Sequence, residues 1–129
     1  MALVSFDRFS LADGSPIYSQ IIRFIKAGIV SGTISDGDEF PSRRALSTLL
    51  GVNPNTIQKA FRLLEEEGLI SSRTGSKSFV CLSHEQTEDI KQQLPRDESR
   101  QYVAHMKAMG MALEETIALI QTIWKEETE

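Results

Sequence analysis

Apolar residues recur every three or four positions between residues 16 and 31, which is the spacing of one helix face. Pro16 opens this predicted helix, and Gly32 ends it because glycine tolerates the left-handed backbone common at helix C-termini. The apolar stripe would pack against a core and consists of Ile17, Ile21, Phe24 or Ile25, Gly28 and Ile29.

A shorter helix is predicted to begin at Ser42 and to end at Leu50. Ser42 is a favourable N-cap residue, and Gly51 suits the turn that follows the last helical residue. We expect the buried face of this helix to consist of Leu46, Leu49 and Leu50.

The next helix is predicted to begin at Pro54, directly after the N-cap residue Asn53, and to close in residues 65–68. Its apolar face consists of Ile57, Phe61 and Leu64. Its outward face carries Asn55, Thr56, Gln58 and Lys59. Two helices joined by a tight glycine turn form a helix-turn-helix, and a polar start of the second helix is typical of a recognition helix for the DNA major groove.

Residues 69–74 and 77–82 flank Gly75 and Ser76 in a pattern typical of a β-hairpin. A hairpin directly after a helix-turn-helix is a wing, and residues 39–40 are long enough to add a short strand beside it. The predicted fold is therefore mainly α with a small β-hairpin wing: an N-terminal winged helix-turn-helix domain followed by a C-terminal helical dimerisation extension.

The segment after the wing is predicted to form helices. Ser83 and Gln86 have the spacing of a capping box, and Pro95 would stop the helix that starts there. A second helix is expected at about residues 98–109, and a last helix follows it. We divide the chain into an N-terminal arm with partial order (residues 1–15), a winged helix-turn-helix domain (16–82) and a helical dimerisation tail (83–129).

Leucine, isoleucine and tryptophan recur in the last helix at spacings of four, three and four, a stripe too apolar for a helix left in solvent. Either the 98–109 helix covers this stripe alone, or two such helix pairs from two subunits pack together. We favour the homodimer, because two short helices offer little core. The expected dimer interface consists of Val103, Met106, Met109, Leu113, Ile117, Ile120 and Trp124. The methionines here could instead line a pocket for an effector, but adaptable interface packing is the simpler interpretation.

The formal net charge of −4 hides an uneven distribution along the chain. Residues 1–39, 40–80 and 81–129 carry net charges of −2, +3 and −5. The basic segment is the predicted DNA-binding part, and local charge is what phosphates feel at Debye-length distances of about 10 Å. The predicted DNA contacts are Ser42, Arg43, Arg44, Asn53, Asn55, Thr56, Gln58, Lys59, Arg62, Arg73, Gly75, Ser76 and Lys77.

These residues differ in their expected roles. Arg44 can pair with guanine through two nitrogens, and Gln58 can pair with adenine, whereas hydroxyl groups are better suited to fix the DNA backbone. Arg43 is either a second base or phosphate contact or a solvated side chain, and Arg62 is either a phosphate contact or paired with a glutamate of its own helix. In a wing that enters the minor groove, Gly75 would allow close backbone approach.

Other chemistry has little support in the sequence. His84 and His105 are far apart without Cys or carboxylate at ligand spacing, so we expect no metal and no cofactor. Cys81 is interpreted as a small structural thiol, and no constellation of catalytic residues indicates an enzyme. No leader or apolar run of membrane length is evident, so we expect a cytoplasmic protein without a membrane partner.

The ordered series of these motifs resembles the winged-helix domain of the GntR family of bacterial transcription regulators. The matching residues are Pro16-Ile17-Tyr18 with Gln20, Gly32, Gly37-Asp38, Pro41-Ser42 with Arg44 and Leu46, Leu50-Gly51-Val52-Asn53 with Thr56, Lys59-Ala60-Phe61, Glu67-Gly68-Leu69-Ile70, and Gly75 with Phe79-Val80. The resemblance implies that Arg44 is the family's base-contacting arginine. The chain departs from the family at Arg43, usually apolar or acidic, and at Lys77, where a second wing glycine is common.

The short tail resembles that of the YtrA-type subgroup, whose helices serve dimerisation. The resemblance implies a sequence-specific transcription regulator that binds a palindromic DNA operator as a homodimer, a repressor in preference to an activator, with an unknown small molecule as a conceivable effector. The alternative is a winged-helix module for protein–protein contact without DNA binding. A nonbasic recognition helix would be expected for that module, and Lys59 and Arg62 argue against it.

Overall fold

The computed structural model describes residues 2–73 and 77–128. The chain divides into two compact units, Met1–Gln92 and Gln93–Glu129. None of the helices in the described ranges combines the length and the apolar composition that crossing a membrane requires.

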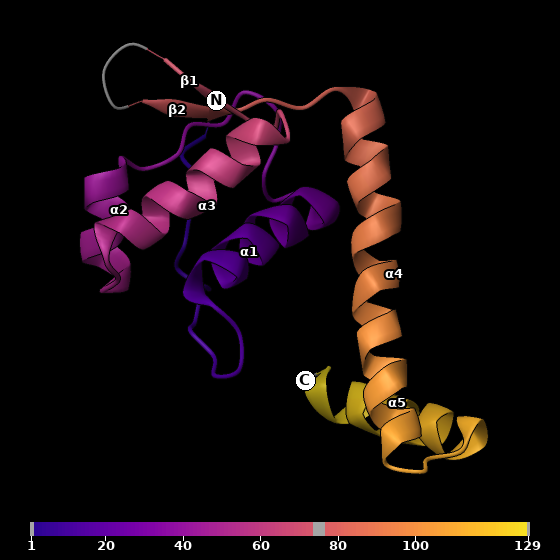
Figure 1. The fold of residues 1–129 in the computed structure, drawn as a ribbon. Coiled ribbons are helices and arrows are strands. Elements are labelled where there is room, and N and C mark those ends of the chain that lie inside the picture. The colour runs from indigo at the N-terminus through magenta and orange to yellow at the C-terminus, as the bar shows by residue number, and fades with distance from the viewer. Residues whose placement is uncertain (1, 74–76, 129) are drawn as a thin grey trace. The chain divides into compact units, whose positions relative to one another are not determined.

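The described part of the first unit contains three whole helices, a β-hairpin and the first turns of a fourth helix (Figure 1). The helices are α1 (Ile17–Ser31), α2 (Arg43–Leu50) and α3 (Pro54–Glu66), and the strands are β1 (Ile70–Ser72) and β2 (Ser78–Val80). The strands pair antiparallel, with Ser71 opposite Phe79. These elements confirm the predicted fold class of a mainly helical domain with a small hairpin wing.

Local side-chain chemistry explains where α2 and α3 begin. The Ser42 hydroxyl accepts a hydrogen bond from the Ala45 backbone N–H at 3.1 Å, and the Asn53 side chain accepts one from the Asn55 backbone N–H at 2.8 Å. Each bond satisfies a backbone donor that has no partner inside its helix. Gly51 separates the two helices with a φ of 67°, a left-handed conformation that glycine adopts without steric cost. The predicted caps and turn are confirmed.

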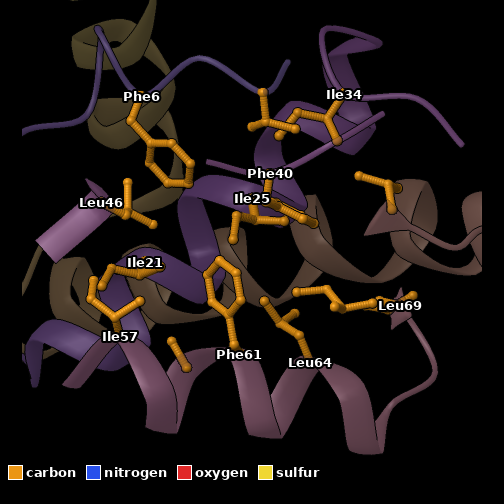
Figure 2. Packing of buried hydrophobic residues seen from close by; sticks show 14 of the residues in the cluster. Phe6, Ile21, Ile25, Ile34, Phe40, Leu46, Ile57, Phe61, Leu64 and Leu69 are labelled. Carbon is orange, nitrogen blue, oxygen red and sulfur yellow. The ribbon is translucent and has the colours of Figure 1, made fainter. Parts of the chain in front are cut away.

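The core of the first unit lies between α1, α3 and the loop before α2 (Figure 2). Phe61 of α3 is fully buried and packs edge-to-face on Phe40 with ring centroids 5.2 Å apart. Burying a side chain of this size contributes about 1.5–3 kcal/mol. The other helical residues of this core are Ile21, Ile25, Ile29, Leu46, Ile57, Ala60 and Leu64.

Two predicted core residues are exposed, Ile17 in the first turn of α1, at 36%, and Leu49 in α2. Leu49 is 63% exposed, whereas Leu46 is fully buried and Leu50 is partly buried. The helix α2 has only eight residues and packs on one side, so its buried face is narrow. Leu46 and Leu50 occupy that face at the i, i+4 spacing, and Leu49 lies at its edge.

The first residues of the chain contribute more to this core than the expected arm suggests. Val4 and Phe6 are buried, and the Phe6 ring stacks on Phe24 of α1 at a centroid distance of 5.2 Å. Leu3 forms a parallel bridge with Glu39, which also forms an antiparallel bridge with Phe79 of β2. The short strand expected beside the wing is thus reduced to single bridges at Glu39, which pair it with β2 on one side and with the N-terminal segment on the other.

The helix α4 (His84–Ala108) begins with the predicted capping box: the Gln86 backbone N–H donates to the Ser83 hydroxyl at 3.0 Å, and the Ser83 N–H donates to the Gln86 side chain at 2.9 Å. The prediction that Pro95 ends this helix is wrong, because α4 continues through it. Proline removes one hydrogen bond from the helix interior at a cost of about 3 kcal/mol, which a helix of 25 residues rich in Gln, Glu, Lys and Arg tolerates.

The second unit contains the C-terminal part of α4 and the helix α5 (Leu113–Glu127). Gly110 has a φ of 77° in the turn between them, and the Met111 N–H donates to the Met106 carbonyl at 3.0 Å. The Glu115 side chain accepts from the Ala112 N–H at 2.9 Å and so stabilises the start of α5. The unit is a helical hairpin, as predicted, although its first helix is continuous with α4.

Candidate nucleic-acid interface

The two faces of α3 separate as the sequence predicts. Ile57, Phe61 and Leu64 are fully buried, which orients the helix against the core. The opposite face is polar and open to solvent. Its exposed residues are Asn53, Asn55, Gln58, Lys59 and Arg62, with Thr56 half-buried beside them.

Two arginines lie in the first turn of α2, which holds no acidic residue. The N-terminus of a helix carries a partial positive charge, so Arg43 and Arg44 are unfavourable there by roughly 0.3–1 kcal/mol each. Arg44 is exposed. A cation placed against the helix dipole is better explained by an anionic partner outside the chain than by helix stability.

Arg43 is held by other parts of the first unit. Its Nη1 donates to Gln58 Oε1 of α3 at 2.8 Å, and its Nη2 donates to the Ser72 hydroxyl of β1 at 3.3 Å. Its guanidinium carbon lies 5.5 Å from the ring centroid of Phe61. The side chain is half-buried, and its Nε is buried without a hydrogen-bond partner. Arg43 thus links α2, α3 and β1. The expectation of a freely solvated side chain is wrong, and a DNA contact by Arg43 stays a prediction.

Two more of the predicted cations stack on aromatic rings. Lys59 Nζ lies 4.1 Å from the ring centroid of Tyr18 in α1, and the Arg73 guanidinium lies 5.0 Å from that of Phe79 in β2. Such contacts orient a long side chain before any ligand arrives. No contact is predicted from the sequence for Tyr18 or Phe79, although both occur in the family pattern. Nothing in the sequence indicates that Ser72 is a partner of Arg43.

The structure describes the two residues that flank the tip of the wing, Arg73 and Lys77. Lys77 is exposed, and its backbone carbonyl accepts from the Arg73 N–H at 2.9 Å across the hairpin. Gly75 and Ser76, which the sequence assigns to minor-groove contact, lie outside the described residues. Within the described ranges no ion pair joins Arg62 to a glutamate of its own helix.

The acidic end of α3 lies away from the polar start of the helix, whereas Arg62 is only three and four residues from Glu65 and Glu66. Glu66 is 12 residues after Pro54, a rise of roughly 18 Å at about 1.5 Å per residue, which exceeds the Debye length of about 10 Å. Glu67 instead pairs with Lys26 of α1 at 2.9 Å. The glutamates at the end of α3 are therefore too far away to cancel the positive electrostatic potential at the start of this helix.

The second unit presents an apolar surface on its helical hairpin. Three residues of the predicted interface on α5 are exposed: Trp124 at 73%, Leu113 at 69% and Ile120 at 40%. Leu119 and Ile123, which were not predicted to lie in the interface, are exposed as well. A groove of about 760 Å³ lies along this surface, lined by Tyr102, Val103, Ile120, Ile123 and Trp124 with Glu98 and Glu127. Met109 and Ile117 are also exposed, but Met106 is buried inside the unit.

Metal chemistry finds no support among the residues that the structure describes, because no three His, Cys, Asp or Glu side chains gather to hold an ion. His84 and His105 are both exposed on α4. Cys81 is a free, exposed thiol next to β2, so it is not packed as a structural thiol would be.

A capped helix pair with a tight glycine turn, a second helix with an outward polar face, and an antiparallel hairpin define a winged helix-turn-helix DNA-binding domain. The family of bacterial regulatory proteins described as the gntR family matches residues 17–80. The HTH-type transcriptional regulator YhcF of Bacillus subtilis is 34% identical over 107 residues, covering 83% of this chain and 88% of YhcF. The chain therefore belongs to the GntR family of bacterial transcription regulators, which are not enzymes.

The likeness extends beyond the winged-helix domain. The HTH-type transcriptional repressor YtrA of Bacillus subtilis is 32% identical over 110 residues, covering 84% of this chain and 85% of YtrA. A GntR family transcriptional regulator from Listeria monocytogenes has a similar structure, with a TM-score of 0.73, 32% identity, and coverage of 87% of this chain and 98% of that chain. The expected likeness to YtrA-type members of the family is confirmed.

Proposed function

We propose that this protein is a cytoplasmic repressor that binds a palindromic DNA operator as a homodimer, with the α3 helices of two subunits in successive major grooves. The polar, outward face of α3 beside the cationic start of α2 carries this proposal. The similarity to YtrA, which is named a repressor, supports the direction of regulation.

Within each half-site, Arg44 is the residue best suited to contact guanine, because it is exposed and its fork can donate to O6 and N7. Ser42 and Asn53 accept from backbone N–H groups at the starts of α2 and α3, and they would bring those helix ends close to phosphates. Lys59, Arg62, Arg73 and Lys77 would hold the DNA backbone on either side.

The apolar surface of the second unit supports the dimer. Exposed Trp124, Leu113 and Ile120 form a row along α5 that water solvates poorly. A second copy of the same hairpin would cover this row through a two-fold interface. The groove beside Trp124 is also the place in this unit where a small-molecule effector would make most apolar contact. An effector bound there would compete with the packing of the two hairpins or change it.

The alternative function is a winged-helix module for protein–protein contact. The two arginines in the first turn of α2 disfavour it, since a protein-binding surface does not need cations at the positive end of a helix.

Selection from a pool of randomised 30-base-pair duplexes, followed by sequencing of the bound fraction, tests the proposal. We expect an inverted repeat to be enriched and the complex to contain two protein chains. Enrichment of no sequence would favour the protein-binding alternative, and enrichment of a single unrepeated half-site would exclude the dimeric mode of binding.

A further inference from the structure

The side chains of Arg43 and Gln58 meet on the DNA-facing side of the first unit although they belong to different helices. Arg43 Nη1 donates to Gln58 Oε1 at 2.8 Å. Both terminal nitrogens of Arg43 are engaged, because Nη2 donates to the Ser72 hydroxyl at 3.3 Å. The guanidinium also lies over the buried Phe61 ring, 5.5 Å from its centroid. Three elements therefore fix the position of this cation.

This contact determines which way the Gln58 amide points. An arginine has five N–H donors and no acceptor, so only the carbonyl oxygen of the glutamine can face it. The amide nitrogen of Gln58, with its two donors, must then point elsewhere. A glutamine without such a partner can rotate and present either its oxygen or its nitrogen to a ligand.

The placement of Arg43 is not the one that stability alone would favour. Its Nε is buried without an acceptor, and an unmet buried donor costs free energy. It also carries its charge at the positive end of α2. In the described part of the chain, the side-chain hydrogen bonds of Arg43 go only to Gln58 and Ser72. These two contacts are therefore what Arg43 gains in return for both costs.

We propose that Arg43 determines base specificity by positioning Gln58: it holds the amide oxygen inward, so that the exposed N–H donors of Gln58 meet acceptors on a base edge. Purine N7, guanine O6 and thymine O4 are such acceptors in the major groove, whereas cytosine offers only its N4 donor there. Cytosine is therefore rejected at the position that Gln58 reads. Adenine remains compatible, because its N7 accepts from an amide N–H of Gln58.

This inference rests on the proposed DNA-binding function, so its test uses full-length protein and the duplex that the wild type selects from a randomised pool. Affinity is measured for every single-base variant of one half-site. Arg43→Met keeps an unbranched side chain at this position and removes the guanidinium with all its donors. We expect it to reduce the discrimination against cytosine at one base pair by about tenfold, with much smaller changes at the other positions.

Gln58→Ala identifies the base pair concerned. It should lose discrimination at the same base pair, and the double variant should be no less specific there than Gln58→Ala alone. Arg62→Met is the matched control, because it removes an exposed arginine from the same surface. It should weaken binding to all the duplexes by one common factor.

Arg43→Lys separates positioning from phosphate binding. Lysine keeps the charge that a phosphate needs but lacks the planar fork that bridges Gln58 and Ser72. A positioning role predicts that Arg43→Lys loses specificity as Arg43→Met does. Near wild-type behaviour of Arg43→Lys, or uniform weakening by Arg43→Met, would show a phosphate contact and overturn the proposal.

A measurement without DNA distinguishes failure of this inference from failure of the proposed function. The unfolding free energies of the wild type, Arg43→Met, Gln58→Ala and the double variant form a double-mutant cycle. Coupling between the two side chains is expected in the free protein. Additive changes in unfolding free energy would overturn the positioning role of Arg43 even if DNA binding is confirmed. Coupling in the free protein, together with no enriched sequence in the selection experiment, would reject the proposed function and, with it, the inferred role in specificity.

Discussion

Lys59 of α3 points its ammonium group at the face of the Tyr18 ring in α1, 4.1 Å from the ring centroid. Cation–π contacts at exposed sites contribute about 0.5–1 kcal/mol. We therefore expect Tyr18→Leu to lower the free energy of unfolding by about that amount in urea titrations. Tyr18→Phe keeps the ring and should unfold close to the wild type. Equal losses in both variants would show that the tyrosine hydroxyl, and not the cation on the ring face, is responsible.

Arg44→Ala should cost on the order of 1–3 kcal/mol in operator affinity and relax the preference for one base pair in each half-site, because the paired donors to guanine are removed. Ser42→Ala should weaken all sequences about equally and lower stability by about 1 kcal/mol, because the hydroxyl caps α2. Both are measured on a panel of single-base operator variants, with thermal melts to separate unfolding from impaired recognition. If Arg44→Ala scales every variant by one factor, Arg44 contacts phosphate.

Operator affinity should fall steeply with salt, because cations at phosphates release counterions. Lys77→Ala should reduce the slope of log K against log salt by about 0.9 for each phosphate that the lysine neutralises, for specific and random duplexes alike. The matched control is Lys125→Ala, which removes an exposed lysine from α5. An unchanged slope for Lys77→Ala would place this lysine away from the DNA, and a wild-type affinity independent of salt would contradict the DNA-binding function.

Ile120→Glu should weaken the proposed dimer, since a charge is costly in a buried apolar interface, whereas the 40% exposure of Ile120 makes the substitution tolerable within one subunit. We expect the dimer Kd to rise at least about tenfold in sedimentation equilibrium, which is about 1.4 kcal/mol. Leu49→Glu is the control, because Leu49 is 63% exposed on α2 and lies outside the proposed interface. A dimer that survives Ile120→Glu would place the subunit contact elsewhere.

Phe6→Ala should destabilise the first unit by about 3–5 kcal/mol, because Phe6 is 3% exposed and stacks on Phe24. Leu11→Ala, at a site 46% exposed in the same N-terminal segment, should change the unfolding free energy by less than about 0.5 kcal/mol. Similar small effects from both would mean that the first residues are dispensable for the core.

Features set by a few neighbouring residues could be predicted from the sequence. Ser42, Asn53 and Gly51 act on the backbone within three residues of themselves, so their types and positions specify the helix starts and the turn. The apolar period of α3 likewise determines which face is buried. The helix-turn-helix and its polar surface follow from such local rules.

Features that depend on distant partners could not be predicted. The contacts of Arg43 come from positions 15 and 29 residues away, and no local pattern relates them. Pro95 predicts a stop because proline disfavours a helix interior, but the cost is outweighed by the long favourable sequence around it. The buried Val4 and Phe6 lie in a segment without periodicity. Their position is explained by the bridge of Leu3 with Glu39 and by the stacking of Phe6 on Phe24, both with partners far along the chain.

The ion pair between Lys26 and Glu67 fastens the end of α3 to α1, and the Lys59 contact with Tyr18 fastens an earlier turn of α3 to the same helix. Two attachment points along one helix oppose pivoting about either, and the buried residues that α1 and α3 share in the core oppose it further. A regulatory signal then has little means of bending the recognition helix. In the homodimeric repressor that we propose, such a signal would act on the distance or angle between the two subunits, so that repression would be relieved by mismatch with the operator spacing and not by disruption of the base-reading surface.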